Sequence, residues 1–279
     1  MSILSLRIFR TGRSNLSILL LYGVMAIPFL SPMSSNTLWS HTGDNELYTY
    51  LQLIDQAKKG IEEGQFPLQV APERYYGWRY PIFQFYAPLT YTVAGYLQLA
   101  ISPDNPLIPF KILMWLAMVL AGFGAYKVAH YLFRSRGAAI IGGAVCLTAP
   151  FMLVNMHVRY QMQECLSAGL LPLAVYCLIR CFVAGRLFIV WAALAWSAVL
   201  HTYGLTFLWG GLFTGALFCT WSNLKIKTWF RWRRAIVAGA IGLLLSAWYF
   251  APIAIWSKYL EFEMPKNTLT PLSFDLSPP

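Results

Sequence analysis

Long apolar stretches recur along the 279 residues of this chain, and they constrain its fold more than any other feature. A helix needs about 20 mostly apolar residues to cross a bilayer. The windows that approach this length are 15–32, 81–101, 107–132, 137–153, 165–184, 187–201, 204–222 and 235–257. Hydrophobic residues make up 58% of the chain and charged residues 11%, against about 45–50% and about 25% in soluble domains. The pattern therefore predicts a polytopic membrane protein and excludes a soluble enzyme, a coiled coil and a disordered chain.

The first apolar window has two interpretations. Arg7, Arg10 and Arg13 precede an apolar run that extends from Leu16 to Leu30, which suits either an uncleaved anchor or a cleaved signal peptide. We favour the anchor. Both interpretations leave residues 33–80 on the side of the membrane away from the cytoplasm.

The basic residues decide which windows cross. Lys and Arg total 21 against 11 Asp and Glu, a net charge of +10, and such an excess is expected in cytoplasmic loops. If every window crossed, Arg134, Arg136 and the basic cluster 225–234 would face the outside. If one window before residue 107 stays on the surface, these residues return to the cytoplasm and the acidic residues all lie opposite. The charge excess therefore indicates membrane topology, and nucleic acid is not an expected partner.

The window expected to stay on the surface is 81–101. It contains Pro81 and Pro88, and its many aromatic residues suit the membrane–water interface. The other windows predict about seven spans, over about 15–32, 107–132, 137–153, 165–184, 187–201, 204–222 and 235–257. The N-terminus is then cytoplasmic, and the tail 258–279 is extracytoplasmic.

A long extracytoplasmic loop, 33–106, is expected between the first two spans. Within it Leu47, Leu51 and Ile54 recur at helical spacing with charged residues on the other faces, which predicts an amphipathic surface helix over about 45–63. The segment 81–101 would be the second surface helix of this loop. The expected fold class is therefore all-α, a single membrane domain over 1–279 with juxtamembrane helices in its first loop.

Two places in the predicted external loops carry carboxylates near the membrane. Asp44 stands where the amphipathic helix begins, so it could act as a general base or simply cap the helix. Arg159 and Glu164 lie between two spans, about one and a half helical turns apart. Arg159 could bind a phosphate and Glu164 could pair with it or touch a substrate, or the two could form an interfacial salt bridge alone.

Several aromatic and basic residues are further candidates for substrate binding. Arg79 and Trp78 belong to a segment rich in aromatic and charged residues, together with Glu73 and Arg74. Such a segment suits sugar or lipid-phosphate recognition, and it also suits an ordinary interfacial aromatic belt. Lys111 could reach a lipid phosphate or snorkel to the interface. His201, in the predicted turn before residue 204, could bind substrate or serve packing.

No familiar motif of soluble chemistry occurs in the chain. A phosphate-binding loop, a nucleophile elbow, a zinc-protease motif and a dinucleotide fingerprint are all missing. The cysteines lie in or beside apolar runs without metal-like spacing, and they are expected to be small core residues; they are Cys146, Cys165, Cys177, Cys181 and Cys219. The sequence therefore gives no certain cofactor and no metal site, and whether a divalent metal is needed stays open, since no residue pattern supports one.

Four segments carry a resemblance to a known class of enzymes. They are GDNELYTYLQLIDQAKKGIEEGQFP, GWRYPIFQFYAPLTY, LTAPFMLVNMHVRYQMQECLSAGLLPL and, more weakly, LHTYG. Their order resembles that of the GT-C class of membrane glycosyltransferases. The closest likeness is to bacterial multispanning proteins labelled as related to 6-pyruvoyl-tetrahydropterin synthase. The resemblance covers essentially the whole chain, as an N-terminal seven-span module, and nothing in the residues indicates pterin chemistry.

The resemblance implies both a site and an activity. Asp44 matches the catalytic carboxylate of these proteins, and Arg159 and Glu164 match the arginine and glutamate of their second external loop. Tyr48 stands where the related bacterial proteins usually have a histidine, and the second loop lacks a DxD motif for a metal-bridged donor.

The implied activity is sugar transfer from a polyprenyl-phosphate carrier to a glycan or protein acceptor. It would take place at the outer face of the bacterial cytoplasmic (inner) membrane. The main alternative is a non-catalytic membrane partner or transport subunit that keeps the module, and a third, weaker one is a lipid or saccharide carrier. Whether the chain is an enzyme stays open at this point. The two carboxylates favour the enzyme.

Overall fold

The computed structural model describes residues 3–33, 46–74, 77, 79–86, 88–184, 187–225 and 229–256. Every regular element in these ranges is a helix, and the sole β pairing among them is an isolated bridge between Ala71 and Tyr80. The predicted all-α fold class is therefore confirmed. The helical character follows from the apolar stretches, because a backbone surrounded by lipid must satisfy its hydrogen bonds within each segment.

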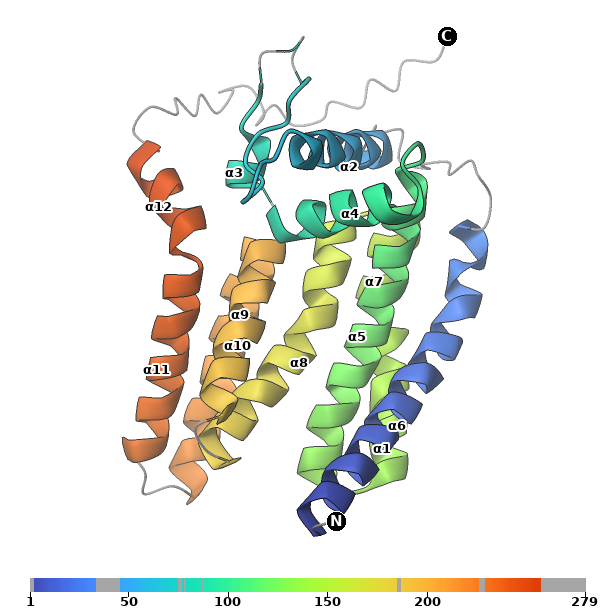
Figure 1. Cartoon of the computed structure of the whole chain (residues 1–279). Helices are drawn as coiled ribbons and strands as arrows, with labels where there is room; N and C mark the ends of the chain where they lie inside the picture. The colour runs from blue at the N-terminus through green and yellow to red at the C-terminus, as the bar shows by residue number, and fades with distance from the viewer. Residues whose placement is uncertain are drawn as a thin grey trace, which may run out of the picture.

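Most of the long helices lie side by side in one bundle (Figure 1). They are α1 (Ile3–Ala26), α5 (Leu107–Phe133), α6 (Arg136–Leu147), α8 (Met162–Ala184), α9 (Leu187–Thr202), α10 (Gly204–Lys225) and α11 (Trp229–Leu245). Shorter helices extend these, namely η1 (Ile27–Met33) after α1, α7 (Pro150–His157) after α6, and α12 (Ala247–Trp256) after α11.

Three helical segments of the described chain are long and apolar enough to cross a membrane. They are Leu107–Phe133, Arg136–His157 and Met162–Val183, and shorter apolar helices cover Asn15–Leu30, Leu187–Thr202 and Gly204–Cys219. The outer surface of the bundle is also apolar: Leu16 is 58% exposed and Leu244 is 73% exposed. Large exposed apolar surfaces of this kind fit contact with lipid. The membrane character is thus supported, while the count of about seven spans remains a prediction.

Helices α2 (Glu46–Glu62), α3 (Ile82–Phe85) and α4 (Pro88–Ile101) gather at one end of the bundle, and α2 and α4 lie across it (Figure 1). We refer to α2 and α4 together as the cap. Leu53, Ile54 and Ala57 of α2 are fully buried. The segment 81–101 is not one continuous helix, because Tyr86 is extended, with φ −141° and ψ 108°, and a new helix starts at Pro88. A proline fits the first turn of a helix, where its missing N–H is not needed.

Small residues allow the helices to approach closely. A Cβ atom added at Gly95 of α4 would lie 3.0 Å from the backbone of Ala57 in α2. One added at Gly124 of α5 would lie 2.6 Å from the backbone nitrogen of Leu173 in α8. Close approach of backbones at glycine is common where membrane helices pack. The cap helices and the α5–α8 pair are thus each held by contacts that a larger residue would prevent.

Breaks inside two predicted spans depend on single polar or proline residues. The predicted span 137–153 consists of α6 and α7, separated at Thr148, and Pro150 begins α7. The predicted span 235–257 is divided at Ser246, whose hydroxyl donates to the carbonyl of Gly242 at 2.9 Å. Such back-bonding by serine is known to bend helices.

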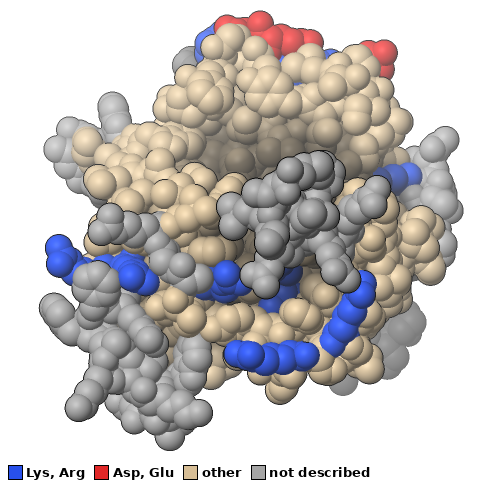
Figure 2. Space-filling model, turned by 60° about the horizontal axis from the view of Figure 1, so that its bottom comes forward, with Lys and Arg blue, Asp and Glu red and all other residues tan. Residues whose placement is uncertain are grey.

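The acidic residues of the described chain lie at the cap end of the bundle, whereas basic residues occur at both ends and include a group at the end opposite the cap. Figure 2 shows Lys and Arg gathered over the end opposite the cap, and Asp and Glu at the far edge beside further basic residues. The elements at the basic end carry Arg134, Arg136, Arg180, Arg233 and Arg234. The cap, its loops and the first turn of α8 carry Asp55, Glu62, Glu63, Glu73, Asp104 and Glu164. This sorting is what the positive-inside argument requires, although the side of the membrane on which each end lies remains a prediction.

Candidate functional site

A tight turn between α7 and α8 positions the charged residues at the cap end of the bundle. Tyr160 adopts a left-handed conformation with φ 54°, and the backbone N–H of Gln161 donates to the carbonyl of Asn155 at 2.9 Å. The chain reverses here, so that residues before and after the turn face each other. As a result Arg159 and Glu164 meet directly.

Arg159 and Glu164 form an ion pair with unequal exposure. Nη1 of Arg159 lies 3.1 Å from Oε2 of Glu164 and also donates to Oδ1 of Asn155 at 2.8 Å. The Glu164 side chain is 11% exposed, whereas that of Arg159 is 45% exposed. A guanidinium has five N–H donors, so the exposed part of Arg159 can still bind an anion while Glu164 holds it.

Glu164 has a second partner in Tyr203, which lies between α9 and α10. The phenol of Tyr203 donates a hydrogen bond to the carboxylate. Burial first, and then the negative charge of Glu164 and its hydrogen bond, together raise the pKa of Tyr203 to about 12, whereas the charge of Arg159 opposes the increase. Both effects favour the protonated phenol. We call Asn155, Arg159, Glu164 and Tyr203 the arginine cluster.

A buried polar network lies beside the arginine cluster and joins it to the cap. Tyr50 of α2 donates to Oε1 of Gln161, and Nε2 of Gln163 donates to the Tyr50 hydroxyl at 3.1 Å and to Tyr86. Gln163 is fully buried, and its Oε1 accepts no hydrogen bond from any described residue. The start of α8 therefore presents one charged and two amide side chains directly beneath the cap.

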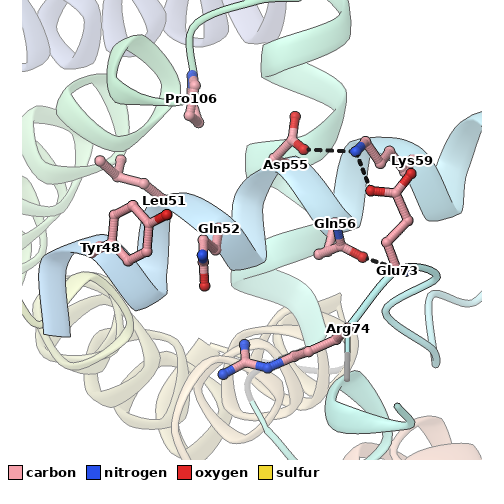
Figure 3. A pocket seen from close by; sticks show the side chains of 9 residues that line it. All are labelled: Tyr48, Leu51, Gln52, Asp55, Gln56, Lys59, Glu73, Arg74 and Pro106. Atoms are coloured by element: carbon pink, nitrogen blue, oxygen red, sulfur yellow. Dashed lines mark hydrogen bonds and ion pairs between the residues drawn. The ribbon is translucent and has the colours of Figure 1, made fainter. Parts of the chain in front are cut away.

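A polar pocket of about 520 Å³ opens on the other face of α2 (Figure 3). Its lining combines one side of α2 with the loop after it, and consists of Tyr48, Leu51, Gln52, Asp55, Gln56, Lys59, Glu73, Arg74 and Pro106. We call it the cap pocket.

Lys59 holds both carboxylates of the cap pocket. Its Nζ lies 3.3 Å from Asp55 and also binds Glu73, while the backbone N–H of Glu73 donates to Gln56 at 2.7 Å. The hydrogen bond with Glu73 raises the pKa of Lys59, and the same bond lowers the pKa of Glu73. Lys59 and Glu73 therefore both stay charged near neutral pH.

Arg74 is the charged group of the cap pocket that lacks such a partner. It forms no ion pair with a carboxylate of the described residues, and its Nη1 atom is buried without a hydrogen-bond acceptor among them. Its positive charge interacts electrostatically with the buried phenol of Tyr91 in α4. Burial raises the pKa of Tyr91 well above its usual value, and the charge of Arg74 partly opposes that increase.

The predicted site residues that the structure describes lie on several different elements. Asp44 and Trp78 lie outside the described residues. Arg79 is exposed and pairs with Glu63 at 3.0 Å, and Lys111 occupies the first turns of α5. Tyr48 is 62% exposed and lines the cap pocket. The structure brings the predicted residues Arg159 and Glu164 into direct contact with each other.

His201 makes its contacts with α9 and α12. Its ring stacks on Trp248 with centroids 5.2 Å apart, and its Nδ1 lies 2.8 Å from the carbonyl oxygen of Ser197. It also lines a mainly apolar cavity of about 470 Å³ between the loop after α2, α4, α9 and α12. Its surroundings fit the packing interpretation, although the buried Nε2 has no partner in the described chain.

Several residues of the site were not among the predictions. These are Asn155, Tyr203, Tyr50, Tyr86, Gln161 and Gln163. The sequence did contain one signal: polar residues are unusual at the start of a long apolar helix such as α8, and each needs a partner or a function there.

No metal centre is visible in the described part of the chain. Among those residues no group of three or more His, Cys, Asp or Glu side chains is arranged to hold a metal ion. The cysteines are all free thiols.

Comparison with known proteins gives one match. Residues 83–278 match the model of a family of membrane proteins described as containing a 6-pyruvoyl-tetrahydropterin synthase related domain. This match covers more than half of the chain and includes the arginine cluster, but it begins after α2. No curated protein and no solved structure gave a match.

Proposed function

We propose that this chain transfers a sugar from a lipid-linked donor. The premise is its family: the chain belongs to the membrane proteins with a 6-pyruvoyl-tetrahydropterin synthase related domain. The donor would be a polyprenyl-phosphate sugar, as the resemblance to the GT-C class implies. The reaction would take place beneath the cap, on the extracytoplasmic side of the inner membrane.

The observation that carries this proposal is the arginine cluster at the capped end of an apolar bundle. Arg159 is held by Glu164 and Asn155, so its guanidinium has a fixed position. A fixed guanidinium binds phosphate oxygens in two parallel hydrogen bonds more readily than a mobile one. A lipid phosphate whose chain lies in the bilayer would present its head group at this level.

The chemistry assigns a separate step to each residue. The bond between the sugar carbon and the phosphate oxygen breaks, and its electron pair stays on the phosphate. Arg159 would stabilise the charge that develops there. The acceptor hydroxyl attacks the sugar carbon, and Asp44 would take its proton. The contact between Glu164 and Arg159 supports a positioning role for Glu164.

Transfer of radiolabelled sugar from polyprenyl-phosphate sugar in membranes tests the proposal. Arg159→Gln should reduce transfer at least about a hundredfold, and Asp44→Asn should reduce it by about 10² to 10⁴. Arg136→Gln, at the opposite end of the bundle, removes the same charge and should leave transfer unchanged. Equal transfer by wild type and Asp44→Asn would remove Asp44 from the mechanism.

Two further results separate the remaining alternatives. If Glu164 positions Arg159, Glu164→Asp should retain more transfer than Glu164→Gln, since the shorter acid still offers a carboxylate. If the wild type transfers no sugar from any polyprenyl-phosphate donor, the enzyme proposal fails. The non-catalytic membrane partner then becomes the better explanation.

A further inference from the structure

The cap pocket contains a cation, Arg74, that no carboxylate of the described residues neutralises. Asp55 and Glu73 are both bound to Lys59, whereas Arg74 has no carboxylate partner among the described residues. Figure 3 shows the Arg74 guanidinium pointing away from the Glu73 carboxylate and beneath α2, toward the side of Gln52. A guanidinium stays charged at every accessible pH, and burying one of its nitrogens without an acceptor is costly. The pocket therefore favours a ligand that brings a negative group to Arg74.

The rest of the lining argues against a simple inorganic anion. Asp55 and Glu73 would repel a multiply charged ion, and they accept hydrogen bonds only from donors such as hydroxyl groups. Gln52 and Gln56 offer amides that both donate and accept. Tyr48 is exposed beside them and offers an aromatic face and a phenol. These groups match a ligand with several hydroxyls and a single anionic substituent.

The size of the pocket agrees with such a ligand. Its volume of about 520 Å³ lies within the range of about 300–1,000 Å³ that is common for small-molecule sites. Its lining comes from a regular helix, α2, whose opposite face is fully buried at Leu53, Ile54 and Ala57. The polar side chains from α2 are therefore held on a packed element, as a specific binding site requires.

We propose that the cap pocket binds a sugar that carries one anionic group, with Arg74 holding the anion and Gln52, Asp55 and Glu73 holding hydroxyls. A sugar acid and a sugar phosphate share this chemistry. The inference stands on the cap pocket alone, since no residue of the arginine cluster lines it. Binding in the cap pocket and transfer at the arginine cluster can therefore succeed or fail independently.

Saturation-transfer NMR and calorimetry on the full chain in nanodiscs test the proposal with D-glucuronate, D-glucose 6-phosphate, D-glucose and inorganic phosphate. At least one of the two anionic sugars should bind about tenfold or more tightly than glucose and than inorganic phosphate, because a charge-assisted hydrogen bond is added to the hydroxyl contacts. The comparison of glucuronate with glucose phosphate identifies whether a carboxylate or a phosphate is preferred.

Variants locate the binding within the cap pocket. Arg74→Gln should remove the preference for the anionic sugar, Arg74→Lys should retain part of it, and Gln52→Ala should weaken the anionic and neutral sugars alike. Arg136→Gln is the matched control and should bind as wild type does. A thermal unfolding midpoint within the wild-type range shows that each variant is folded.

Three results would overturn the proposal. The first is no binding of either anionic sugar by the folded wild type. The second is binding of inorganic phosphate or glucose as tight as that of the anionic sugars. The third is an unchanged preference in Arg74→Gln.

Discussion

Tyr50 of α2 donates a hydrogen bond to Oε1 of Gln161, the residue that immediately precedes α8. The two residues are 111 positions apart and both are buried. Gln163 donates to the same hydroxyl at 3.1 Å. A helix that lies across the bundle is thereby fixed, through one phenol, to the helix that carries Glu164.

Tyr50→Phe should weaken this attachment. Losing the hydroxyl leaves Gln161 without the hydrogen bond from Tyr50 in a buried site, which should lower the free energy of unfolding by about 1–3 kcal/mol. Unfolding in mixed micelles, followed by circular dichroism, measures the change. Tyr48→Phe is the control, since Tyr48 is exposed on the same helix and its change should stay within about 0.5 kcal/mol. Equal effects of the two substitutions would contradict the assignment of the network.

Gly124→Ala should disrupt the packing of α5 against α8. The added Cβ would lie 2.6 Å from the backbone nitrogen of Leu173 and 3.0 Å from Cβ of Pro172. Such overpacking typically costs about 1–3 kcal/mol, and unfolding in mixed micelles measures it. Gly215→Ala of α10 meets no described atom within 4 Å, so it should be neutral or slightly stabilising. If Gly124→Ala unfolds as the wild type does, the two helices are not in close contact there.

The phenol of Tyr203 should lose its proton only at high pH, because Glu164 contributes to raising its pKa. Its folded-state pKa of about 12 exceeds the ordinary value of about 10. Folding therefore gains stability from the protonated phenol below about pH 10, and loses it as the pH rises through about 12. The difference in 295 nm absorbance between wild type and Tyr203→Phe isolates this titration. Glu164→Gln should shift the midpoint of the Tyr203 titration to lower pH. An unchanged midpoint would show that Glu164 does not contribute to the raised pKa.

Asp104 and Arg136 should be reached from opposite sides of the membrane. Asp104 lies in the connection before α5, and Arg136 is the first residue of α6, just after the other end of α5. In a background that carries Cys219→Ser to remove the exposed native thiol, a membrane-impermeant thiol reagent added to intact cells should label Asp104→Cys. It should label Arg136→Cys only after the membrane is permeabilised. The reverse pattern would place the arginine cluster in the cytoplasm and exclude the proposed extracytoplasmic reaction.

The sequence was sufficient for the fold class because apolar length and helical spacing are local properties. Leu47 and Ile54 recur at helical spacing, and both are buried in α2. The proximity of Arg159 and Glu164 was foreseeable for the same reason, since they are only five residues apart. The break at Ser246 was not foreseen, because it depends on how one hydroxyl bonds to the preceding turn.

The rest of the candidate site depends on contacts between distant segments. Tyr203 reaches Glu164 only because α9 and α10 pack beside α8, and no periodicity in the sequence marks this partner. The cap pocket likewise combines α2 with Glu73, Arg74 and Pro106. A composition rich in aromatic and charged residues predicted a binding surface there. It could not show that, among the described residues, Lys59 would pair with the carboxylates and Arg74 would not.

The close contact at Gly95 limits how the protein can admit a large molecule. A Cβ atom added at Gly95 would lie 2.8 Å from the Ile61 side chain and 3.0 Å from the α2 backbone. The main chains of the two cap helices are therefore in close contact at this residue. Because separating the two helices would break this contact, we expect them to move together as one unit. A lipid carrier would then enter laterally from the bilayer, between neighbouring helices, and would not pass between the two helices of the cap.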